Sequence, residues 1–341
     1  MSAAAPASVL VVRLGSLGDL VHAVPAVAAL RHAWPSARID WLVEPAHAEF
    51  LRLVSIINSV IVLRGKSARG WMETRTELRA RGYDVAVDLQ GLIKSAALAR
   101  LSGAARVWGF DRAALREASA HWFYTDAPVV GEGRHVIEKN LALVQAVIGA
   151  SPTDRAAALE FPLQVPDSAA QKTLRRSVPG PYAVLNPGAA WPNKRWPIDS
   201  FAAVARWISS TYGWTPVVLW GPADEALADG IVTASEGVAC KAPATAIADI
   251  LAIAREARVF VSGDTGPLHL ACAMGTPAVA MFGPTTPARN GPWDDRDVSI
   301  SRYDSCPCHY ERTCRQPDRW CLATITVDDV TGAITRRVEG A

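Results

Sequence analysis

An acidic side chain near the start of the chain could act as a base. It is Asp19, which ends a glycine-containing turn over residues 13–19 and falls in the first turn of an expected helix. Gly15 and Gly18 let this turn come close to a ligand. The carboxylate either accepts a proton from a reacting hydroxyl group or only complements the helix dipole. The glycine spacing differs from the G-x-G-x-x-G pattern of dinucleotide folds, which disfavours a nicotinamide site.

A turn in the second half of the chain could bind phosphate. This turn is residues 263–266, which include Asp264, Thr265 and Gly266. It follows an apolar run and precedes an expected helix that begins with a proline. Free N–H groups at the start of such a helix bind anions, although the same residues also make an ordinary helix cap. His269 lies one turn inside the helix, where it either faces a ligand or packs as a structural residue.

A further loop, residues 186–197, carries small residues and two adjacent cations, Lys194 and Arg195. Small residues let a ligand approach the backbone, and the cations could hold a diphosphate. A solvated basic loop is the alternative interpretation.

Basic side chains recur near the expected strand ends of the first half. They are Arg64, Lys66, Arg69, Lys94, Arg112, Arg116, Arg134 and Lys139. Each alone is an ordinary surface charge, whereas together they could bind an anionic acceptor. The formal net charge is only +2, and no aromatic residues interleave with the cluster, so we expect no nucleic-acid partner.

Four of the six cysteines, Cys306, Cys308, Cys314 and Cys321, fall in one segment near the C-terminus. Four thiolates so close together suit a tetrahedral zinc or iron with a structural role. Only one residue separates the first two, which is tighter than the usual zinc knuckle, and His309 is a substitute ligand. Free or paired thiols are the alternative.

The composition indicates a globular protein of two domains. The chain has 341 residues, of which 50% are hydrophobic and 20% charged, so it is too long for one small core and too apolar for disorder. Residues 1–8 lack the basic start of a secretory signal, and the uncharged stretch 265–288 is broken by glycines and prolines. We therefore expect a cytoplasmic protein, in which structural disulfides are disfavoured.

Short apolar runs alternate with helical stretches along the chain, which is the pattern of parallel α/β sheets. The expected strands are 9–12, 39–43, 60–63, 85–89 and 107–110, then 183–186, 217–220, 238–239, 259–262 and 278–282. Residues 151–180 contain no long periodic element and are taken as a linker. The prediction is two doubly wound, Rossmann-like domains, 1–165 and 166–341, facing across a cleft. Ligands of such sheets bind at the carboxyl ends of the strands, where the loops described above lie.

Taken in order, these loops resemble the heptosyltransferases of lipopolysaccharide inner-core synthesis, glycosyltransferase family 9. The resemblance runs from Val9 to about Val327. It rests on residues 15–19, 83–84, 88–96, 116–117, 135–138, 186–188, 194–197 and 263–269. Single motifs are weak, but their order is specific, and residues 90–96 are more similar to heptosyltransferase I than to heptosyltransferase II.

The resemblance implies a GT-B fold, ADP-L-glycero-D-manno-heptose as donor, Kdo of a lipid A precursor as acceptor, and inversion at the anomeric carbon. It also implies work at the inner face of the cytoplasmic membrane. Asp19 matches the general base, and Lys194 is the second catalytic position. Donor-binding positions are Gly15, Gly18, Lys194, Glu225, Asp264, Thr265, Gly266 and His269, and acceptor-binding positions are Arg64, Lys94 and Arg116.

These roles agree with the chemistry of a single displacement. A carboxylate takes the proton of the attacking hydroxyl group, and one displacement inverts the centre. Lys194 and a helix N-terminus stabilise the charge of the departing ADP, so no catalytic metal is expected. The Asp-x-Asp sequence at 295–297 lies in a stretch expected to be solvated surface and is a weak metal signal.

The cysteine segment departs from the enteric members of the family. Other members carry a similar cluster, which in a protein-modifying branch resembles an iron-binding finger. The alternatives that stay open are a heptosyltransferase II, a protein-modifying heptosyltransferase, a nucleotide-binding oxidoreductase and a zinc-ribbon module.

Overall fold

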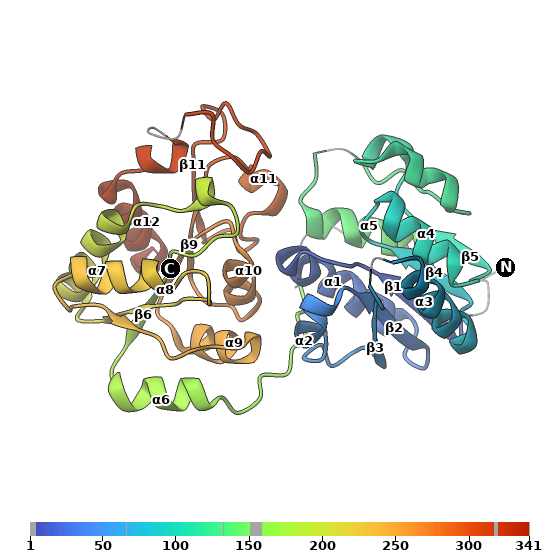
Figure 1. Cartoon of the computed structure of the whole chain (residues 1–341), viewed down its shortest axis with the longest axis horizontal. Helices are drawn as coiled ribbons and strands as arrows, with labels where there is room; N and C mark the ends of the chain where they lie inside the picture. Colours follow the sequence, from blue (N-terminus) through green and yellow to red (C-terminus); the bar gives the residue numbers. More distant parts are fainter. Residues whose placement is uncertain (1–4, 66, 132, 151–158, 317–319, 341) are drawn as a thin grey trace. The chain divides into compact units, whose positions relative to one another are not determined.

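The computed structural model describes residues 5–65, 67–131, 133–150, 159–316 and 320–340. The chain forms two compact units, Met1–Gln164 and Val165–Ala341. Each unit contains a parallel β-sheet with helices on both faces (Figure 1). The predicted α/β class with two doubly wound sheets is therefore confirmed.

The sheet of the first unit is built around its first strand. Its strands are β1 (Ser8–Val12), β2 (Arg38–Val43), β3 (Ser59–Val62), β4 (Val85–Asp88) and β5 (Arg106–Trp108). They are hydrogen-bonded in the order β3-β2-β1-β4-β5, and every pair is parallel. The order changes direction between β1 and β4, where open α/β sheets bind their ligands.

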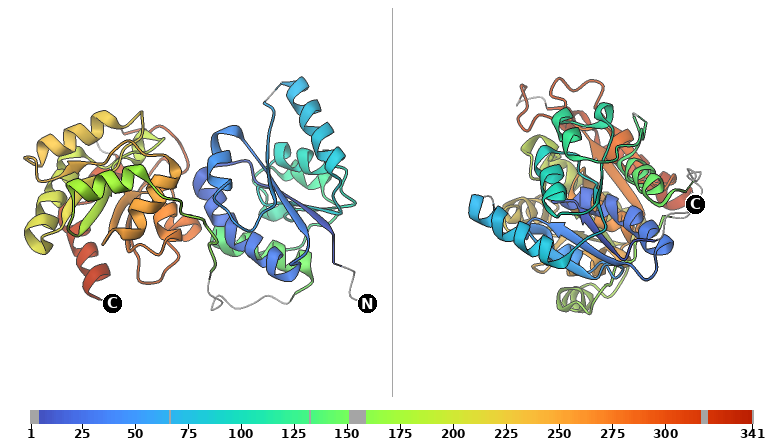
Figure 2. Two further views of the ribbon diagram at one scale, coloured as in Figure 1. Left: turned by 90° about the horizontal axis from the view of Figure 1, so that it is seen from below. Right: turned by 90° about the vertical axis from the view of Figure 1, so that its right-hand side faces the viewer.

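Helices cover both faces of this sheet (Figure 2). They are α1 (Leu17–Ala33), α2 (Ala48–Leu51), α3 (Ala68–Arg81), α4 (Ile93–Leu101) and α5 (Val136–Ile148), with short 3-10 helices η1 (Pro45–His47), η2 (Arg112–Ala114) and η3 (Ala118–Phe123). Leu78 of α3 and Leu98 of α4 pack with Leu10 and Val12 of β1 in one core. Helices α1 and α5 pack against each other and lie on the other face. Strand β1 is thus apolar from Val9 to Val12, because both of its faces are buried there.

The second unit repeats this architecture with one more strand. Its strands are β6 (Tyr182–Asn186), β7 (Thr215–Val218), β8 (Cys240–Lys241), β9 (Phe260–Gly263), β10 (Ala278–Phe282) and β11 (Val298–Ser301). Their order is β11-β10-β9-β6-β7-β8, again all parallel. The switch point here lies between β6 and β9.

Successive residues of β6 enter different cores, because side chains alternate between the faces of a strand. Leu185 packs with α7 (Ile198–Tyr212), α8 (Glu225–Ala234) and α12 (Val327–Glu339). Val184 packs with α6 (Ala169–Ser177), α9 (Ile247–Glu256) and α10 (Gly266–Ala273). The remaining elements are η4 (Pro192–Lys194), α11 (Pro287–Asn290) and η6 (Cys321–Thr324). Within the described ranges, no helix is long and apolar enough to span a membrane.

Two predicted elements were wrong. Strand β8 begins at Cys240 rather than at Val238, because a turn held by the Ala239 N–H and Ser235 Oγ (3.2 Å) separates it from α8. The predicted linker contains α6, a short amphipathic helix that packs on α9. Its first part, residues 151–158, lies outside the described residues.

The stretch 295–297 is solvated surface only in part: Asp295 and Arg296 are exposed, as expected, but Asp297 is not. Strand β11 follows it, and was missed because only Ile300 of its four residues is buried. The side chain of Asp297 is only 3% exposed, and its carboxylate accepts hydrogen bonds from Arg337 Nε (2.6 Å) and the Ala278 N–H (2.8 Å). The strand therefore brings this carboxylate against α12, where it serves the fold.

Candidate functional site

Asp19 lies at the switch point of the first sheet, in the first turn of α1. One carboxylate oxygen, Oδ1, forms an ion pair with Arg13 Nη2 at 2.7 Å. The other, Oδ2, accepts hydrogen bonds from the Ser16 N–H (3.2 Å) and Ser16 Oγ (3.0 Å). The side chain is still 24% exposed. It is thus oriented from both sides and remains accessible to a substrate.

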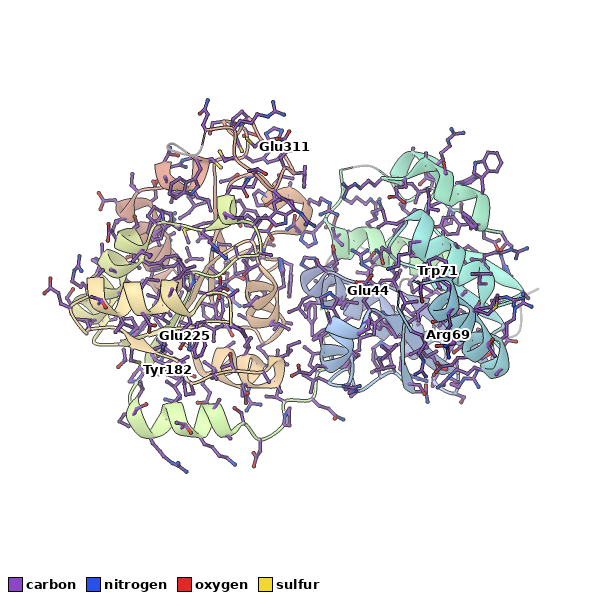
Figure 3. All side chains as sticks on the ribbon, viewed as in Figure 1. Glu44, Arg69, Trp71, Tyr182, Glu225 and Glu311 are labelled. Carbon is purple, nitrogen blue, oxygen red and sulfur yellow. The ribbon has the colours of Figure 1, made fainter. Side chains whose placement is uncertain are left out.

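The loop that follows β2 supplies charged neighbours to this carboxylate. Glu44, labelled in Figure 3, forms an ion pair with Lys94 at the start of α4. Burial lowers the pKa of His47, against the opposing effects of the carboxylates of Glu44 and Asp19. A Cβ on Gly15 would lie 2.7 Å from His47 Nε2, so a side chain at this position would push the imidazole away. Gly15 thus lets the imidazole of His47 lie against the turn.

The predicted acceptor-binding cations occupy two loops of the first unit and the start of α4. Arg64 is 57% exposed and pairs with Glu77 of α3 at 3.1 Å, while Arg116 is exposed. The segment of Arg116 is tied to the start of α4, because Glu117 Oε2 accepts a hydrogen bond from the Ile93 N–H (2.8 Å). This contact brings the chain around Arg116 close to the helix that carries Lys94.

The other five basic residues differ in setting. Arg112 and Arg134 are exposed. Arg69 is 89% exposed and pairs with Glu73, whereas Lys139 lies over the ring of Phe110 and donates to a backbone carbonyl. Lys66 lies outside the described residues.

In the second unit, Lys194 forms a buried ion pair. Its Nζ lies 2.5 Å from Asp264 Oδ2, and the side chains are 14% and 6% exposed. The same carboxylate accepts hydrogen bonds from Thr285 Oγ1 (2.7 Å) and Asn290 Nδ2 (2.6 Å), and His269 Nε2 lies 3.3 Å from Oδ1. Asp264 is thus surrounded by donors and serves to position Lys194.

The charge of Asp264 is stable although the group is buried. Burial raises the pKa of a carboxyl group, but the hydrogen bond from His269 and the charge of Lys194 outweigh that effect. The net result is a pKa well below the ordinary range. Asp264 therefore stays ionised at neutral pH.

The turn between β9 and α10 is shaped to receive the Lys194 loop. A Cβ on Gly263 would lie 2.7 Å from the carbonyl oxygen of Lys194, so only glycine lets the two backbones pass. Asn186 Nδ2 at the end of β6 donates to Ser262 Oγ (2.8 Å) and Thr265 Oγ1 (3.0 Å). These bonds join the two strands of the switch point directly before α10, which begins at Gly266.

A second group of charges surrounds the start of α8. Glu225 is 52% exposed and pairs with Lys241 at 3.0 Å. Arg195 Nη2 pairs with Asp224 Oδ1 at 2.9 Å, and the pKa of Asp224 is raised by burial against the lowering effect of Arg195. Arg195 is therefore ion-paired with Asp224 and is not an unpaired, solvated charge of the loop.

The four clustered cysteines pack together within the second unit. Cys306, Cys308 and Cys321 are buried and Cys314 packs against them, and all four are free thiols. Backbone N–H groups point at three of the sulfur atoms, from Cys308 to Cys306 (3.4 Å), from Arg315 to Cys308 (3.1 Å) and from Gln316 to Cys314 (3.4 Å). Within the part of the chain that is described, no group of His, Cys, Asp and Glu has the arrangement of a metal site.

The cysteine segment is connected to the Lys194 loop. Asn193 Nδ2 donates to the carbonyl of Glu311 (3.0 Å), and Trp320 Nε1 donates to the carbonyl of Arg195 (2.9 Å). Figure 3 shows sulfur atoms, in yellow, in the same part of the unit as Glu311. The segment therefore supports the loop that carries Lys194.

Several residues of these sites were missed by sequence reasoning. They are Arg13, Glu44 and His47 in the first unit, and Thr285 and Asn290 in the second. Glu44 directly follows β2, so the strand-end rule that selected Asp19 would also have found it. Thr285 and Asn290 come from loop and helix positions after β10 that carry no motif, and only the fold brings them to Asp264.

Comparison with known proteins places these features in a family. A sequence model of glycosyltransferase family 9 (heptosyltransferase) matches residues 71–318. Lipopolysaccharide heptosyltransferase 1 of Pseudomonas aeruginosa is 32% identical over 323 residues, which cover 90% of this chain and 87% of that protein. The protein of the same name from Salmonella typhimurium is 28% identical over 297 residues, and this alignment covers 83% of this chain and 90% of that protein.

A solved structure agrees with this result. The Escherichia coli heptosyltransferase WaaC with ADP superposes with a TM-score of 0.77 at 26% identity, covering 97% of this chain and 99% of that one. The match of the family model and the identity to the Pseudomonas protein establish the relationship independently of the fold. The chain therefore belongs to glycosyltransferase family 9, the heptosyltransferase family, and is a glycosyltransferase.

Proposed function

We propose that this enzyme transfers L-glycero-D-manno-heptose from ADP-heptose to Kdo of the lipopolysaccharide inner core, with inversion at the anomeric carbon. The observation that carries the proposal is the buried Lys194–Asp264 pair beside the start of α10, at the switch point of the second sheet. The similarity to lipopolysaccharide heptosyltransferase 1, and to a structure of WaaC with ADP, supports the choice of sugar and nucleotide.

The second unit is proposed to bind the donor. Lys194 faces the bridging and terminal oxygens of the diphosphate, and the free N–H groups that begin α10 at Gly266 and the Thr265 turn bind the same charge. Glu225, which is half exposed at the start of α8, binds the ribose hydroxyl groups. As the bond between C1 and the phosphate oxygen breaks, Lys194 stabilises the charge that develops on ADP.

The first unit is proposed to bind the acceptor and to supply the base. Asp19 accepts the proton of the Kdo hydroxyl group as that oxygen attacks C1 of the heptose. Gly15 and Gly18 leave room for the substrates at this turn. Arg64, Lys94 and Arg116 bind the carboxylate and phosphate groups of the acceptor, which is held at the inner face of the cytoplasmic membrane.

A structural zinc or iron at Cys306, Cys308, Cys314 and Cys321 is part of the proposal, supported by the donor set alone. Four thiols that pack together in a segment with few apolar side chains match the preference of these metals for sulfur. The metal has no part in the transfer. Its role is to stabilise the segment that contacts the Lys194 loop.

The experiment that tests the function is an acceptor panel. The purified enzyme is incubated with ADP-heptose and, separately, with Kdo-lipid A, with a core that already carries one heptose, and with an acceptor protein, and the products are weighed by mass spectrometry. We expect a gain of one heptosyl residue on Kdo-lipid A alone. Transfer only to the heptosylated core, or only to protein, would replace Kdo as the acceptor and leave the heptosyl transfer intact.

A further inference from the structure

A buried arginine stands directly behind the carboxylate of Asp19. Arg13 follows β1 and its side chain is 8% exposed. Its Nη2 pairs with Asp19 Oδ1 at 2.7 Å, and its Nη1 donates to the carbonyl of Leu89, which follows β4. The carbonyl of Arg13 accepts a hydrogen bond from the buried Trp41 Nε1 (3.2 Å). The guanidinium therefore links the ends of both switch-point strands to one carboxylate.

Burying a cation in this position costs free energy, which its contacts must offset. Removing an ionised group from water carries a penalty that one ion pair offsets only with good geometry. Arginine meets this condition because its planar fork reaches the backbone carbonyl and the carboxylate at the same time, which a lysine ammonium at the end of a flexible chain does not reproduce. The arrangement fixes the direction of the Asp19 carboxylate relative to the sheet.

The other charged groups around Asp19 come from two further elements. His47, which ends η1, is close enough to interact with Asp19, but burial lowers the pKa of its imidazole. Glu44 precedes η1 and is paired with Lys94 of α4. Ser16 contributes only neutral donors. Among these neighbours, Arg13 is the cation in direct contact with the carboxylate.

We propose that Arg13 is a positioning residue for the base: it orients the carboxylate of Asp19 and places a positive charge against it. This inference rests on the proposed function, because it requires Asp19 to accept the proton. Arg13 itself touches no reacting atom. Orientation matters because a misplacement of about 1 Å between reacting groups costs roughly 10²-fold in rate.

The test compares Arg13→Lys and Arg13→Met, each in the wild-type chain and together with Asp19→Asn. For each, kcat, KM for both substrates, the pH profile of kcat/KM and Tm are measured. Arg106→Met is the matched control, because it removes another arginine–carboxylate pair of the first unit, with Asp126 at 2.6 Å. We expect both Arg13 variants to lower kcat by about 10-fold to 10²-fold with KM for ADP-heptose unchanged.

The pH profile separates orientation from charge. An opposite charge at this distance favours the ionised carboxylate, so Arg13→Met should move the acid limb of the profile to higher pH. Arg13→Lys keeps the charge and should leave the acid limb in place while kcat stays low. In the Asp19→Asn background, either change should alter kcat by less than about 2-fold, because both act through the same group.

Three results would overturn the inference. They are a wild-type kcat in both Arg13 variants, an equal loss with and without Asp19→Asn, and a change confined to KM for the acceptor. If Arg13→Met does not fold, Arg13→Lys and its double variant decide the matter by the same criteria. Failure of the proposed function itself is recognised separately, since Asp19→Asn alone would then retain turnover.

Discussion

Replacing Lys194 should damage both stability and chemistry, and the structure allows the two effects to be separated. In Lys194→Ala the buried carboxylate of Asp264 loses its cation. Breaking a buried pair costs about 3–5 kcal/mol. Because Thr285, Asn290 and His269 still contact the carboxylate, we expect a smaller loss of roughly 2–3 kcal/mol. For a unit of this size we expect Tm to fall by about 4–12 °C.

The chemical effect adds to the structural one. The charge-assisted contact with the leaving group is worth about 1.5–3 kcal/mol, so kcat should fall by about 10-fold to 10²-fold at temperatures where the variant is folded. Tm is measured by calorimetry and kcat by ADP release. Lys172→Ala is the matched control, because Lys172 and its partner Asp167 are 55% and 91% exposed and such exposed pairs contribute little to stability.

A double variant identifies the source of each loss. Lys194→Met with Asp264→Asn removes both buried charges, so Tm should recover most of what the single change loses, whereas kcat should stay low. An unchanged Tm in Lys194→Ala would refute the energetic argument. An unchanged kcat in the folded single variant would refute the role of Lys194 at the leaving group.

Three further outcomes are expected. The pKa of Asp264 is lowered in the folded chain, so the ionised carboxylate stabilises the fold fully above the pKa of the unfolded chain, about 3.9. This stabilisation is lost as the pH falls below that value. In Asp264→Asn, the free energy of unfolding from urea titrations should therefore fall less steeply between pH 6 and pH 3. Gly263→Ala places a Cβ 2.7 Å from the Lys194 carbonyl and should weaken ADP binding about 10-fold by calorimetry, with a stability loss of about 1–3 kcal/mol. Cys314→Ser should lower the zinc or iron content found by elemental analysis and reduce Tm by about 5 °C or more, whereas a metal-free wild-type chain would contradict the metal assignment.

The fold was predictable where apolar runs are long. Strand β10 matches its predicted bounds, 278–282, because all of its residues are buried and no polar side chain interrupts the pattern. Strand β11 was missed because it is an edge strand with one buried residue. Helix α6 was missed because its nine residues are too few for a long periodic signal, and packing on α9 helps to stabilise it.

The candidate sites were predictable only in part. Asp19 and Lys194 follow strands, and the strand-end rule selects such positions from the pattern alone. The rule does not predict which side chains form ion pairs. In the sequence Arg13 is only the residue that ends an apolar run, and its ion pair with Asp19 depends on the conformation of the turn between β1 and α1. Asn290 reaches Asp264 across 26 positions of sequence, through a contact that only the folded unit creates.

The central claim is tested most directly by the mass of Kdo-lipid A after incubation with ADP-heptose and the wild-type enzyme, beside the Asp19→Asn variant. The account predicts a gain of one heptosyl residue, with one ADP released for each acceptor modified, and an initial rate lower by about 10² or more in the variant. An acceptor of unchanged mass in the presence of folded, ADP-binding enzyme would contradict heptosyl transfer to Kdo. Equal rates for the two proteins would contradict Asp19 as its base.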